Sequence, residues 1–473
     1  MLFNSFIFFI FLALVLPIHY GLKTNRGKVG FLVAASYIFY SYWDWRFSVL
    51  ILLSTFVDFF IAKKIEDTPQ LFKRKWLVRA SLVVNLGILA FFKYFNFFIE
   101  SFKTLTEQLG CEVSIWYLNI LLPVGISFYT FQTLSYTIDV YRGNQKSEKN
   151  FLNFALYVCF FPQLVAGPIE RAENLLKQFR GGLKATSLQW KEGFHLISIG
   201  LFKKVMIGDA VARIVDPIFA DYSYYNSLEL FSALLLFSVQ IYADFSGYTS
   251  IARGIAKWLG IDLIKNFNEP YLSRNITEFW RRWHISLSSW LRDYLYIPLG
   301  GNRKGTRSTY INLMITMLLG GLWHGASWTF VVWGALHGLY LSIERRFKNT
   351  GPIKLNKEAL SIKDIPSICF TFLLILVTWL FFRAENIHSA FEILKTIVKF
   401  DSSTEGIRLL FMSLSFLATI IGFDLLQRKA NTQSFLYSLI PENSSYVVLT
   451  LLLLVSFTFM FQNKALPFIY FQF

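Results

Sequence analysis

The stretch Leu318-Leu319-Gly320-Gly321-Leu322-Trp323-His324-Gly325-Ala326-Ser327-Trp328 places a histidine between two apolar runs. Glycines stand on both sides of it, and glycine permits sharp turns and close backbone approach. Ionisable side chains at membrane depth are costly, and they usually face a cavity or a partner. His324 is therefore a candidate functional residue, and a neutral, hydrogen-bonded packing histidine is the alternative interpretation.

The composition around this stretch is that of a membrane protein. Hydrophobic residues make up 54% of the 473 residues, and charged residues make up only 16%, against roughly 25% in an average soluble domain. These figures exclude a disordered, fibrous or ordinary soluble chain. The net charge is +16. In a soluble protein such an excess would suggest nucleic-acid binding, but the chain has no basic and aromatic stripe that would form a soluble nucleic-acid module. We therefore attribute the charge to basic loops that fix the membrane topology.

Apolar runs along the chain predict its helices. The first, Leu2–Tyr20, has no basic leader and no cleavage site, and basic residues follow it; we expect a retained span with the N-terminus outside. Each span needs about 20 residues, so shorter or broken runs predict re-entrant or interfacial helices. The later runs lie near 30–41, 47–62, 76–98, 115–136, 151–166, 195–207, 228–243, 309–322, 326–343, 365–382, 407–425 and 446–461. The predicted fold is an all-α, polytopic membrane protein with about 10 to 12 spans.

The chain shows no internal repeat and no Gly/Ser or Pro-rich linker, so a single membrane domain over residues 1–473 is the simplest description. Proline residues and the pair Gly320-Gly321 interrupt several apolar runs, and such breaks indicate either a cavity or kinked packing helices. The three cysteines, Cys111, Cys159 and Cys369, are scattered and form no CxxC pair. They therefore predict neither a metal site nor a disulfide framework.

A basic, aromatic-rich stretch at 266–307 precedes the His324 run, and its composition is typical of an interfacial amphipathic segment. It is either a membrane-surface helix that fixes the topology or the cytoplasmic opening of a site that attracts an anionic donor substrate. Asp244 ends another apolar run and could orient a histidine or pair with an arginine, or form a structural salt bridge. His337 is 13 residues beyond His324. That is no clean same-face helical spacing, so we expect a packing role for His337.

Five motifs follow one another along the chain: Val124–Gly143, Phe161–Pro168, Asp244–Tyr248, Trp280–Arg303 and Leu322–Gly325. In this order they resemble the membrane-bound O-acyltransferase family. The similarity runs from about residue 1 to 345, with its motif core at about 120–345, and continues more loosely to the end. It is closest to the bacterial branch that acetylates alginate, and the teichoic-acid D-alanyl transferases are more distant.

The resemblance implies a ring of tilted helices around a thin central wall with a tunnel. It also implies that His324 is the essential catalytic residue and that His284 is a second polar residue of the site. Neutral histidine suits general-base work on a hydroxyl, and an acyl-histidine intermediate is the competing mechanism. The predicted substrate-binding residues are Asn268, Arg281, Arg282, Arg292, Asp244 and Trp323.

The implied function is transfer of an acyl group, most simply acetyl, from a cytoplasmic thioester to a cell-surface or exported polysaccharide. The donor is acyl-coenzyme A or an acyl-carrier protein, with no bound cofactor or metal. Transfer is direct or passes through a periplasmic or membrane-anchored partner, at the bacterial inner membrane. The alternatives are D-alanyl or longer-acyl transfer, and a transporter without chemistry, which would more typically show a repeated half.

Overall fold

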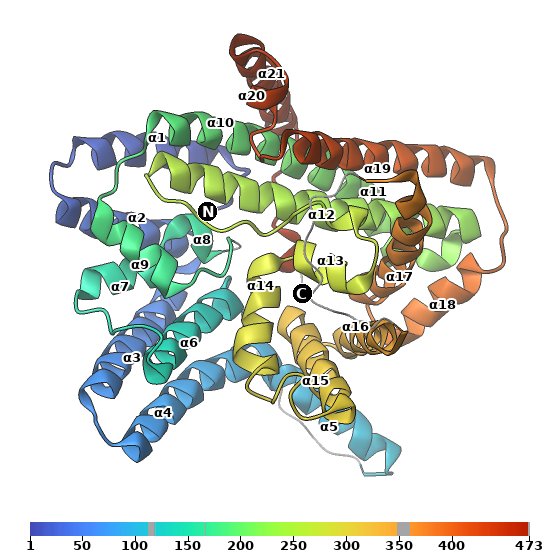
Figure 1. Ribbon diagram of the computed structural model, residues 1–473. Helices are drawn as coiled ribbons and strands as arrows, with labels where there is room; N and C mark the ends of the chain where they lie inside the picture. Colours follow the sequence, from blue (N-terminus) through green and yellow to red (C-terminus); the bar gives the residue numbers. More distant parts are fainter. Residues whose placement is uncertain (112–117, 119, 166, 348–359, 472–473) are drawn as a thin grey trace. The chain divides into compact units, whose positions relative to one another are not determined.

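The computed structural model describes residues 1–111, 118, 120–165, 167–347 and 360–471. Within these residues the secondary structure is helical and contains no strand, which confirms the predicted all-α class. The chain divides into two compact units, drawn together in Figure 1. Unit 1 comprises Met1–Gly193 and Ala252–Ile264, and unit 2 comprises Phe194–Ile251 and Lys265–Phe473.

Six helical segments among the described residues are long and apolar enough to cross a membrane. The predicted number of about 10 to 12 spans is larger because it counts runs that fold into shorter or more polar helices. One example is the run near 115–136: its first residues lie largely outside the described part, and its helix begins only at Ile126. The six segments are Asn25–Asp67, Leu71–Gln108, Ser227–Trp258, Ile362–Arg383, Thr404–Ala430 and Glu442–Gln462.

Unit 1 is built from the first nine helices and from parts of α10 and α12. Their bounds are α1 (Phe6–Gly21), α2 (Asn25–Asp44), α3 (Ser48–Asp67), α4 (Leu71–Leu89), α5 (Phe95–Gln108), α6 (Ile126–Arg142), α7 (Phe151–Cys159), α8 (Phe161–Leu164), α9 (Ala172–Gly181) and α10 (Ser187–Leu201). Helix α2 ends where the side chain of Asp44 accepts a hydrogen bond from the Arg46 backbone N–H. That contact turns the chain into α3.

A buried polar network joins α3, α4 and α6, which pack against one another. The carboxylate of Asp58 accepts hydrogen bonds from Ser81, from Thr137 (2.9 Å, Oγ1 to Oδ1) and from Asn85 (2.8 Å, Nδ2 to Oδ2). Lipid offers no hydrogen-bond partner, so polar groups at membrane depth must be satisfied inside the protein. The network therefore holds these three helices in register.

Unit 2 contains the remaining helices. Their bounds are η3 (Phe202–Asp209), α11 (Ala210–Ala220), α12 (Ser227–Trp258), α13 (Ile276–Arg282), α14 (Ile285–Leu291), η6 (Arg292–Tyr296), α15 (Thr306–His324), α16 (Trp328–Phe347), α17 (Ile365–Arg383), α18 (Ile387–Ile397), α19 (Thr404–Ala430), α20 (Leu436–Leu439), α21 (Glu442–Gln462) and η8 (Ile469–Phe471). Helices α15 and α16 pack side by side, and α17 packs on α16.

Helix α15 runs unbroken through the glycine pair that the sequence suggests as a break. A Cβ atom at Gly321 would lie 2.2 Å from the carbonyl oxygen of Phe330 on α16. The glycine therefore serves close contact between two helix backbones, as small residues do in membrane proteins. His324 is consequently the last residue of a continuous helix.

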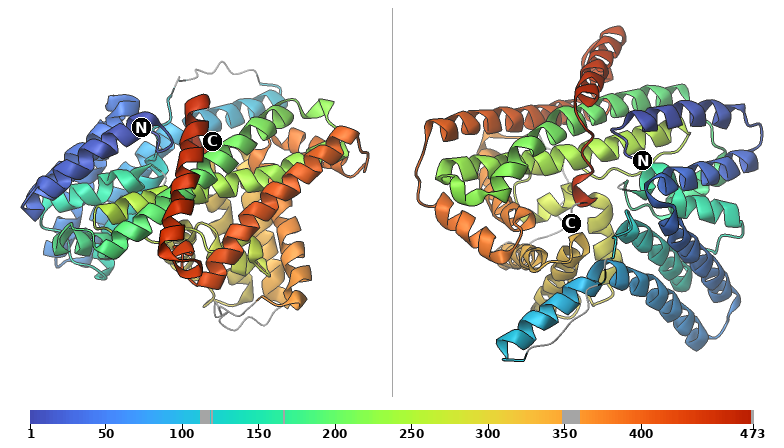
Figure 2. Two further views of the ribbon diagram at one scale, coloured as in Figure 1. Left: turned by 90° about the horizontal axis from the view of Figure 1, so that it is seen from above. Right: turned by 180° about the vertical axis from the view of Figure 1, so that it is seen from behind.

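The chain that follows α21 returns to the interior of unit 2. This stretch, residues 464–471, is called here the return segment, and Figure 2 shows it in red between α21 and the point marked C. It has no regular secondary structure up to Phe468 and ends in the short helix η8. Phe468, Ile469 and Tyr470 are buried, so the segment is a packed part of unit 2.

Candidate active site

His324 is buried at the end of α15, within a group of four aromatic rings. The centroid of its imidazole lies 5.0 Å from the ring of Trp333, 5.1 Å from Trp323, 5.3 Å from Phe382 and 5.4 Å from Tyr470. These rings are called the His324 cage. They come from α15, α16, α17 and the return segment, so four separate parts of unit 2 position one imidazole.

The glycine after the histidine has a steric role. A Cβ atom at Gly325 would lie 2.0 Å from the ring of Phe330, closer than any real contact. Phe330 in turn packs edge-on against Phe382 of the His324 cage, with ring centroids 4.9 Å apart. Gly325 therefore lets the chain turn sharply from α15 into α16 while Phe330 supports the cage.

His284 precedes the first residue of α14, and its backbone has the left-handed conformation, with φ +42°. Residues other than glycine rarely adopt it. Two backbone hydrogen bonds hold the segment in place: Asn268 N to Arg282 O and Ile285 N to Asn266 O, each 2.9 Å. The side-chain oxygen of Asn266 also accepts the N–H of Ser286. Left-handed backbone at a non-glycine residue costs about 1–3 kcal/mol and is retained mainly at functional sites.

The two candidate histidines lie around one indole. The ring of Trp323 is 5.8 Å from that of His284 and 5.1 Å from that of His324, centroid to centroid. Phe245 makes a second connection, because its ring lies 4.7 Å from both His284 and Tyr470. Burial lowers the pKa of His284 to about 3, so this imidazole is neutral at physiological pH.

A cavity of about 530 Å³ lies in unit 2, and Ile285, the residue after His284, is part of its wall. Two of the predicted substrate-binding residues, Arg281 and Arg292, line this cavity. The remaining lining residues are Thr277, Trp280, Ile285, Ser288, Ser289, Leu291, Tyr296, Leu313, Thr316, Met317 and Leu341. Two cations and several hydroxyls on an otherwise apolar wall suit a ligand with an anionic end and an apolar or amide-bearing arm.

Packed rings connect this cavity to the His324 cage. The indole N–H of Trp280, which lines the cavity, donates a hydrogen bond to Nδ1 of His337 over 3.2 Å. The His337 ring lies 4.6 Å from Trp333, which belongs to the cage. Because Nδ1 of His337 accepts, its proton is on Nε2. The packing role that the sequence suggests for His337 agrees with these contacts.

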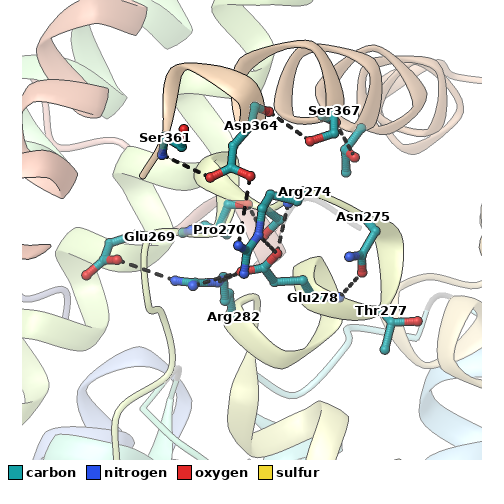
Figure 3. Close-up of polar contacts among 12 residues, drawn as sticks. Glu269, Pro270, Arg274, Asn275, Thr277, Glu278, Arg282, Ser361, Asp364 and Ser367 are labelled. Atoms are coloured by element: carbon teal, nitrogen blue, oxygen red, sulfur yellow. Dashed lines mark hydrogen bonds and ion pairs between the residues drawn. The ribbon is translucent and has the colours of Figure 1, made fainter. Parts of the chain in front are cut away.

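Arg282 occupies an ion-pair network, drawn in Figure 3. Its guanidinium pairs with Glu278 (2.9 Å, Nη2 to Oε1) and Glu269 (3.4 Å, Nη1 to Oε2), and all three side chains are buried. Arg274 binds the other oxygen of Glu278 at 3.1 Å, and Arg428 of α19 reaches Glu269 at 3.6 Å. The network fastens α13 to other parts of unit 2, so it places Arg282 in the scaffold, whereas Arg281 and Arg292 line the cavity.

The other predicted substrate-binding residues have identifiable contacts. The side-chain oxygen of Asn268 accepts a hydrogen bond from Lys265, and its backbone carbonyl accepts one from Arg282. Asp244 pairs with Lys204 and accepts the backbone N–H of Ile469. Trp323 lies between the two histidines. The structure thus brings Trp323 to the histidines, and it shows Asn268 and Asp244 engaged with the protein itself.

Tyr470, Trp333 and Phe382 were missed by sequence reasoning, although all three belong to the His324 cage. A signal for Tyr470 does exist: the polar residues Gln462–Lys464 end the last apolar run, and four apolar or aromatic residues follow Pro467. Trp333 and Phe382 sit within long apolar helices, where nothing in the local pattern separates a cage residue from a packing residue.

A sequence profile of the membrane-bound O-acyltransferase family matches residues 145–384, which include both histidines and every cavity residue. The chain belongs to this family. Family membership, together with the six apolar segments, identifies it as a membrane-embedded acyltransferase. The expected family and enzyme class are thereby confirmed.

Three relatives with different named activities are similar to this chain. The chain is 43% identical over 394 residues to a probable alginate O-acetylase AlgI of Pseudomonas putida, covering 82% of this chain and 79% of the relative. It is 38% identical over 395 residues to a peptidoglycan O-acetyltransferase of Helicobacter pylori, covering 78% and 73%. It is 28% identical over 272 residues to a teichoic acid D-alanyltransferase of Bacillus subtilis, covering 55% and 66%.

Proposed function

We propose that this protein transfers an acetyl group from a cytoplasmic thioester to a cell-surface or exported polysaccharide. The names of its relatives support acetyl as the group and a glycan-containing polymer as the acceptor, since two O-acetylating proteins share 38–43% identity with it. D-alanyl transfer is the second candidate, because a D-alanyltransferase is a more distant relative.

One observation carries the proposal: His284 and His324 lie buried around a single indole ring at the family motif Trp323-His324-Gly325. A buried imidazole is kept neutral by its surroundings, and a neutral imidazole can accept a proton. Aromatic walls exclude water, which strengthens electrostatic contacts and limits hydrolysis of an activated acyl group. This arrangement supports acyl transfer at His324.

The proposed step begins with His324 as general base. It accepts the proton of the acceptor hydroxyl while the hydroxyl oxygen bonds to the thioester carbonyl carbon. The carbon–sulfur bond then breaks, and the imidazolium returns the proton to the leaving thiolate. The products are an ester and a thiol. Neutral His284 would donate its ring N–H to the carbonyl oxygen as negative charge develops there.

The competing step is attack by His324 itself, which would give an acyl-histidine before the acceptor enters. Rapid quenching of the working enzyme with an isotope-labelled acetyl donor, followed by mass spectrometry, separates the two. Hydroxylamine is added only afterwards as a check, because it removes an acyl group from histidine as the hydroxamate. A label on the peptide containing His324 supports the covalent route, and its absence during turnover supports the general-base route.

The donor would enter through the cavity that Arg281 and Arg292 line. Coenzyme A and the prosthetic arm of an acyl-carrier protein both place phosphate at the far end of a thioester-bearing arm. Two arginines suit phosphate oxygens through charge-assisted hydrogen bonds. The thioester end would then reach toward the Trp280–His337–Trp333 rings that connect the cavity wall to the His324 cage.

We place the enzyme in the bacterial inner membrane with its N-terminus outside, because the loop after the first helix is basic and such loops face the cytoplasm. The acceptor receives the group directly or from a periplasmic or membrane-anchored partner. We also propose that residues 1–473 work as one catalytic domain, since the family match at 145–384 draws residues from both units.

The deciding experiment measures ester-linked acetate on the envelope and exported polysaccharide in cells that carry the native chain or His324→Ala at matched expression. His388→Ala is the matched control, because His388 is an exposed histidine on α18. We expect loss of acetate only in His324→Ala. Unchanged acetate with correctly inserted protein contradicts the proposal, and ester-linked D-alanine that disappears instead supports the second candidate.

A further inference from the structure

The carboxylate of Asp244 holds the return segment by its backbone. Asp244 Oδ2 accepts the N–H of Ile469 at 2.8 Å, and Oδ1 pairs with Lys204 Nζ at 2.9 Å. Lys204 also pairs with Asp209 at 2.6 Å and donates to the carbonyl oxygen of Pro467 at 3.5 Å. One buried lysine and one buried aspartate thus bind an N–H and a C=O of the same short segment.

Aromatic contacts bind the side chains of the segment on the same face of α12. The ring of Phe468 lies 4.9 Å from Tyr248 and 5.1 Å from Phe245. Tyr470 lies 4.7 Å from Phe245 and 5.4 Å from His324. The motif Asp244–Tyr248 therefore contacts both the backbone and the side chains of the return segment.

A close helix crossing places Lys204 beside Asp244. A Cβ atom at Gly247 would lie 2.8 Å from the backbone nitrogen of Lys204 and 2.7 Å from the carbonyl oxygen of Gly200. Any side chain at residue 247 would separate α12 from η3 and pull the lysine away. The residues from Asp244 to Tyr248 thus supply a carboxylate, two aromatic contacts and the space that a neighbouring lysine needs.

The cluster joins one buried basic side chain to two buried acidic ones, so the acidic side chains also need hydrogen bonds from neutral groups. Lys204 carries one positive charge, whereas Asp209 and Asp244 carry one negative charge each, and all three are buried. Buried charge is tolerated only when pairing and hydrogen bonds compensate it. The N–H of Ile469 supplies one such bond to Asp244, so the cluster and the segment stabilise each other.

We propose that Lys204 and Asp244 are positioning residues for acyl transfer: they hold the return segment against α12, fix Tyr470 beside His324 and keep water out of the cage. The reaction part of this inference rests on the proposed function. If the segment detaches, water can attack the thioester carbonyl; the carbon–sulfur bond breaks, and the products are a carboxylic acid and a thiol.

The first test measures where the segment lies, without using activity. A photo-crosslinking benzoylphenylalanine replaces Phe468 in the full chain, and mass spectrometry quantifies its adducts on the α12 peptide containing Phe245 and Tyr248. Ile469→Pro removes the N–H that Asp244 accepts and leaves α12 and η3 unchanged. Ile469→Ala keeps that N–H and is the matched control. We expect adduct yield to fall about tenfold in Ile469→Pro relative to Ile469→Ala, and equal yields overturn the proposal.

The second test changes the cluster itself. Lys204→Met with Asp244→Asn keeps the total charge of the cluster, because one positive and one negative group are removed together. The matched control is Lys203→Met with Asp424→Asn: Lys203 is a buried lysine on the same short helix, and it lies over the rings of Tyr242 and Phe423. Both doubles remove one buried lysine and one buried aspartate from unit 2.

In the Lys204/Asp244 double variant we expect the crosslink from position 468 to α12 to be lost. We also expect this variant to transfer at least tenfold less acetate to the acceptor and to release proportionally more free acetate from the donor. The Lys203/Asp424 double keeps the adduct and the ratio of transfer to hydrolysis. An unchanged adduct in the Lys204/Asp244 double variant means that these residues do not hold the return segment, and it overturns the proposal. A lost adduct with native acetyl transfer overturns the positioning role. If the native chain transfers no acyl group, the proposed function fails, while the crosslink still decides whether Lys204 and Asp244 hold the return segment.

Discussion

The phenol ring of Tyr470 lies 5.4 Å from the imidazole ring of His324, centroid to centroid. The two residues come from distant parts of the sequence, η8 and the end of α15. The hydroxyl of Tyr470 is buried and has no hydrogen-bond partner among the described residues. A buried hydroxyl in that condition costs about 1–3 kcal/mol. Such a cost is usually offset where the group meets a substrate.

Removing this hydroxyl tests its role. Tyr470→Phe keeps the ring and its contacts with Phe245 and Phe382 and removes an unpartnered buried hydroxyl, so we expect the protein to insert normally and its melting temperature to rise. We expect acetyl transfer to fall by about 10- to 100-fold, as for loss of one well-placed hydrogen-bonding group near the reacting atoms. The measurement is acetate ester per unit of purified enzyme. Native activity in Tyr470→Phe would mean that the ring alone matters.

The cavity arginines predict a change in donor binding. Arg281→Ala and Arg292→Ala each remove a cation from the cavity wall, so we expect the KM for a phosphate-bearing thioester to rise about tenfold while kcat changes little. Raising the salt concentration should weaken donor binding less in the variants than in the native enzyme, because fewer charges remain to be screened. Arg408→Ala on exposed α19 is the control. A fall in kcat with unchanged KM would place these arginines outside the donor site.

The ion-pair network predicts a change in stability. Arg282→Ala leaves Glu278 and Glu269 buried without their shared cation, so we expect a loss on the order of 3–5 kcal/mol. Arg408 and Glu405 are both exposed, and exposed pairs contribute at most about 1 kcal/mol. Thermal unfolding in detergent should therefore show a large fall in Tm for Arg282→Ala and almost none for Arg408→Ala. Equal melting temperatures would contradict a scaffold role for Arg282.

His284 predicts how stability depends on pH. Its pKa is about 3 in the folded protein, against about 6.5 for an ordinary histidine in the unfolded chain. Between these values the unfolded state binds one proton more, so stability falls as the pH drops below about 6.5, by up to about 1.4 kcal/mol per pH unit. His284→Asn removes this contribution, and asparagine tolerates the left-handed backbone. We expect the fall in Tm from pH 7.5 to pH 5 to be smaller in the variant than in the native protein.

Much of the site was predictable from sequence because its residues carry local signals. His324 stands out as an ionisable residue between apolar runs with glycine neighbours, and the resemblance assigns both histidines their roles. Arg281 and Arg282 show where prediction stops. They are adjacent and chemically identical, yet one lines a cavity and the other is buried between two glutamates. Helical rotation and distant partners decide which is which.

The fold was predictable at the level of class, and less so in the number of spans. Hydropathy marks long apolar helices such as α19 and α21, but it does not separate a helix that spans a membrane from a shorter helix buried within protein. Helix α6 is one: it is buried along most of its length and contributes Thr137 to the Asp58 network. No sequence pattern reports that Asp58, Ser81 and Thr137 meet, because their contact depends on how three helices pack.

The return segment also has a consequence for biosynthesis. Chains emerge from the ribosome in order, and Phe468, Ile469 and Tyr470 are made after every helix that contributes another wall of the His324 cage. The cage is therefore open until the last described residues have been translated and folded back. A nascent chain that already holds both histidines lacks the Tyr470 wall, so closure of the cage begins only once the helices of unit 2 have been made.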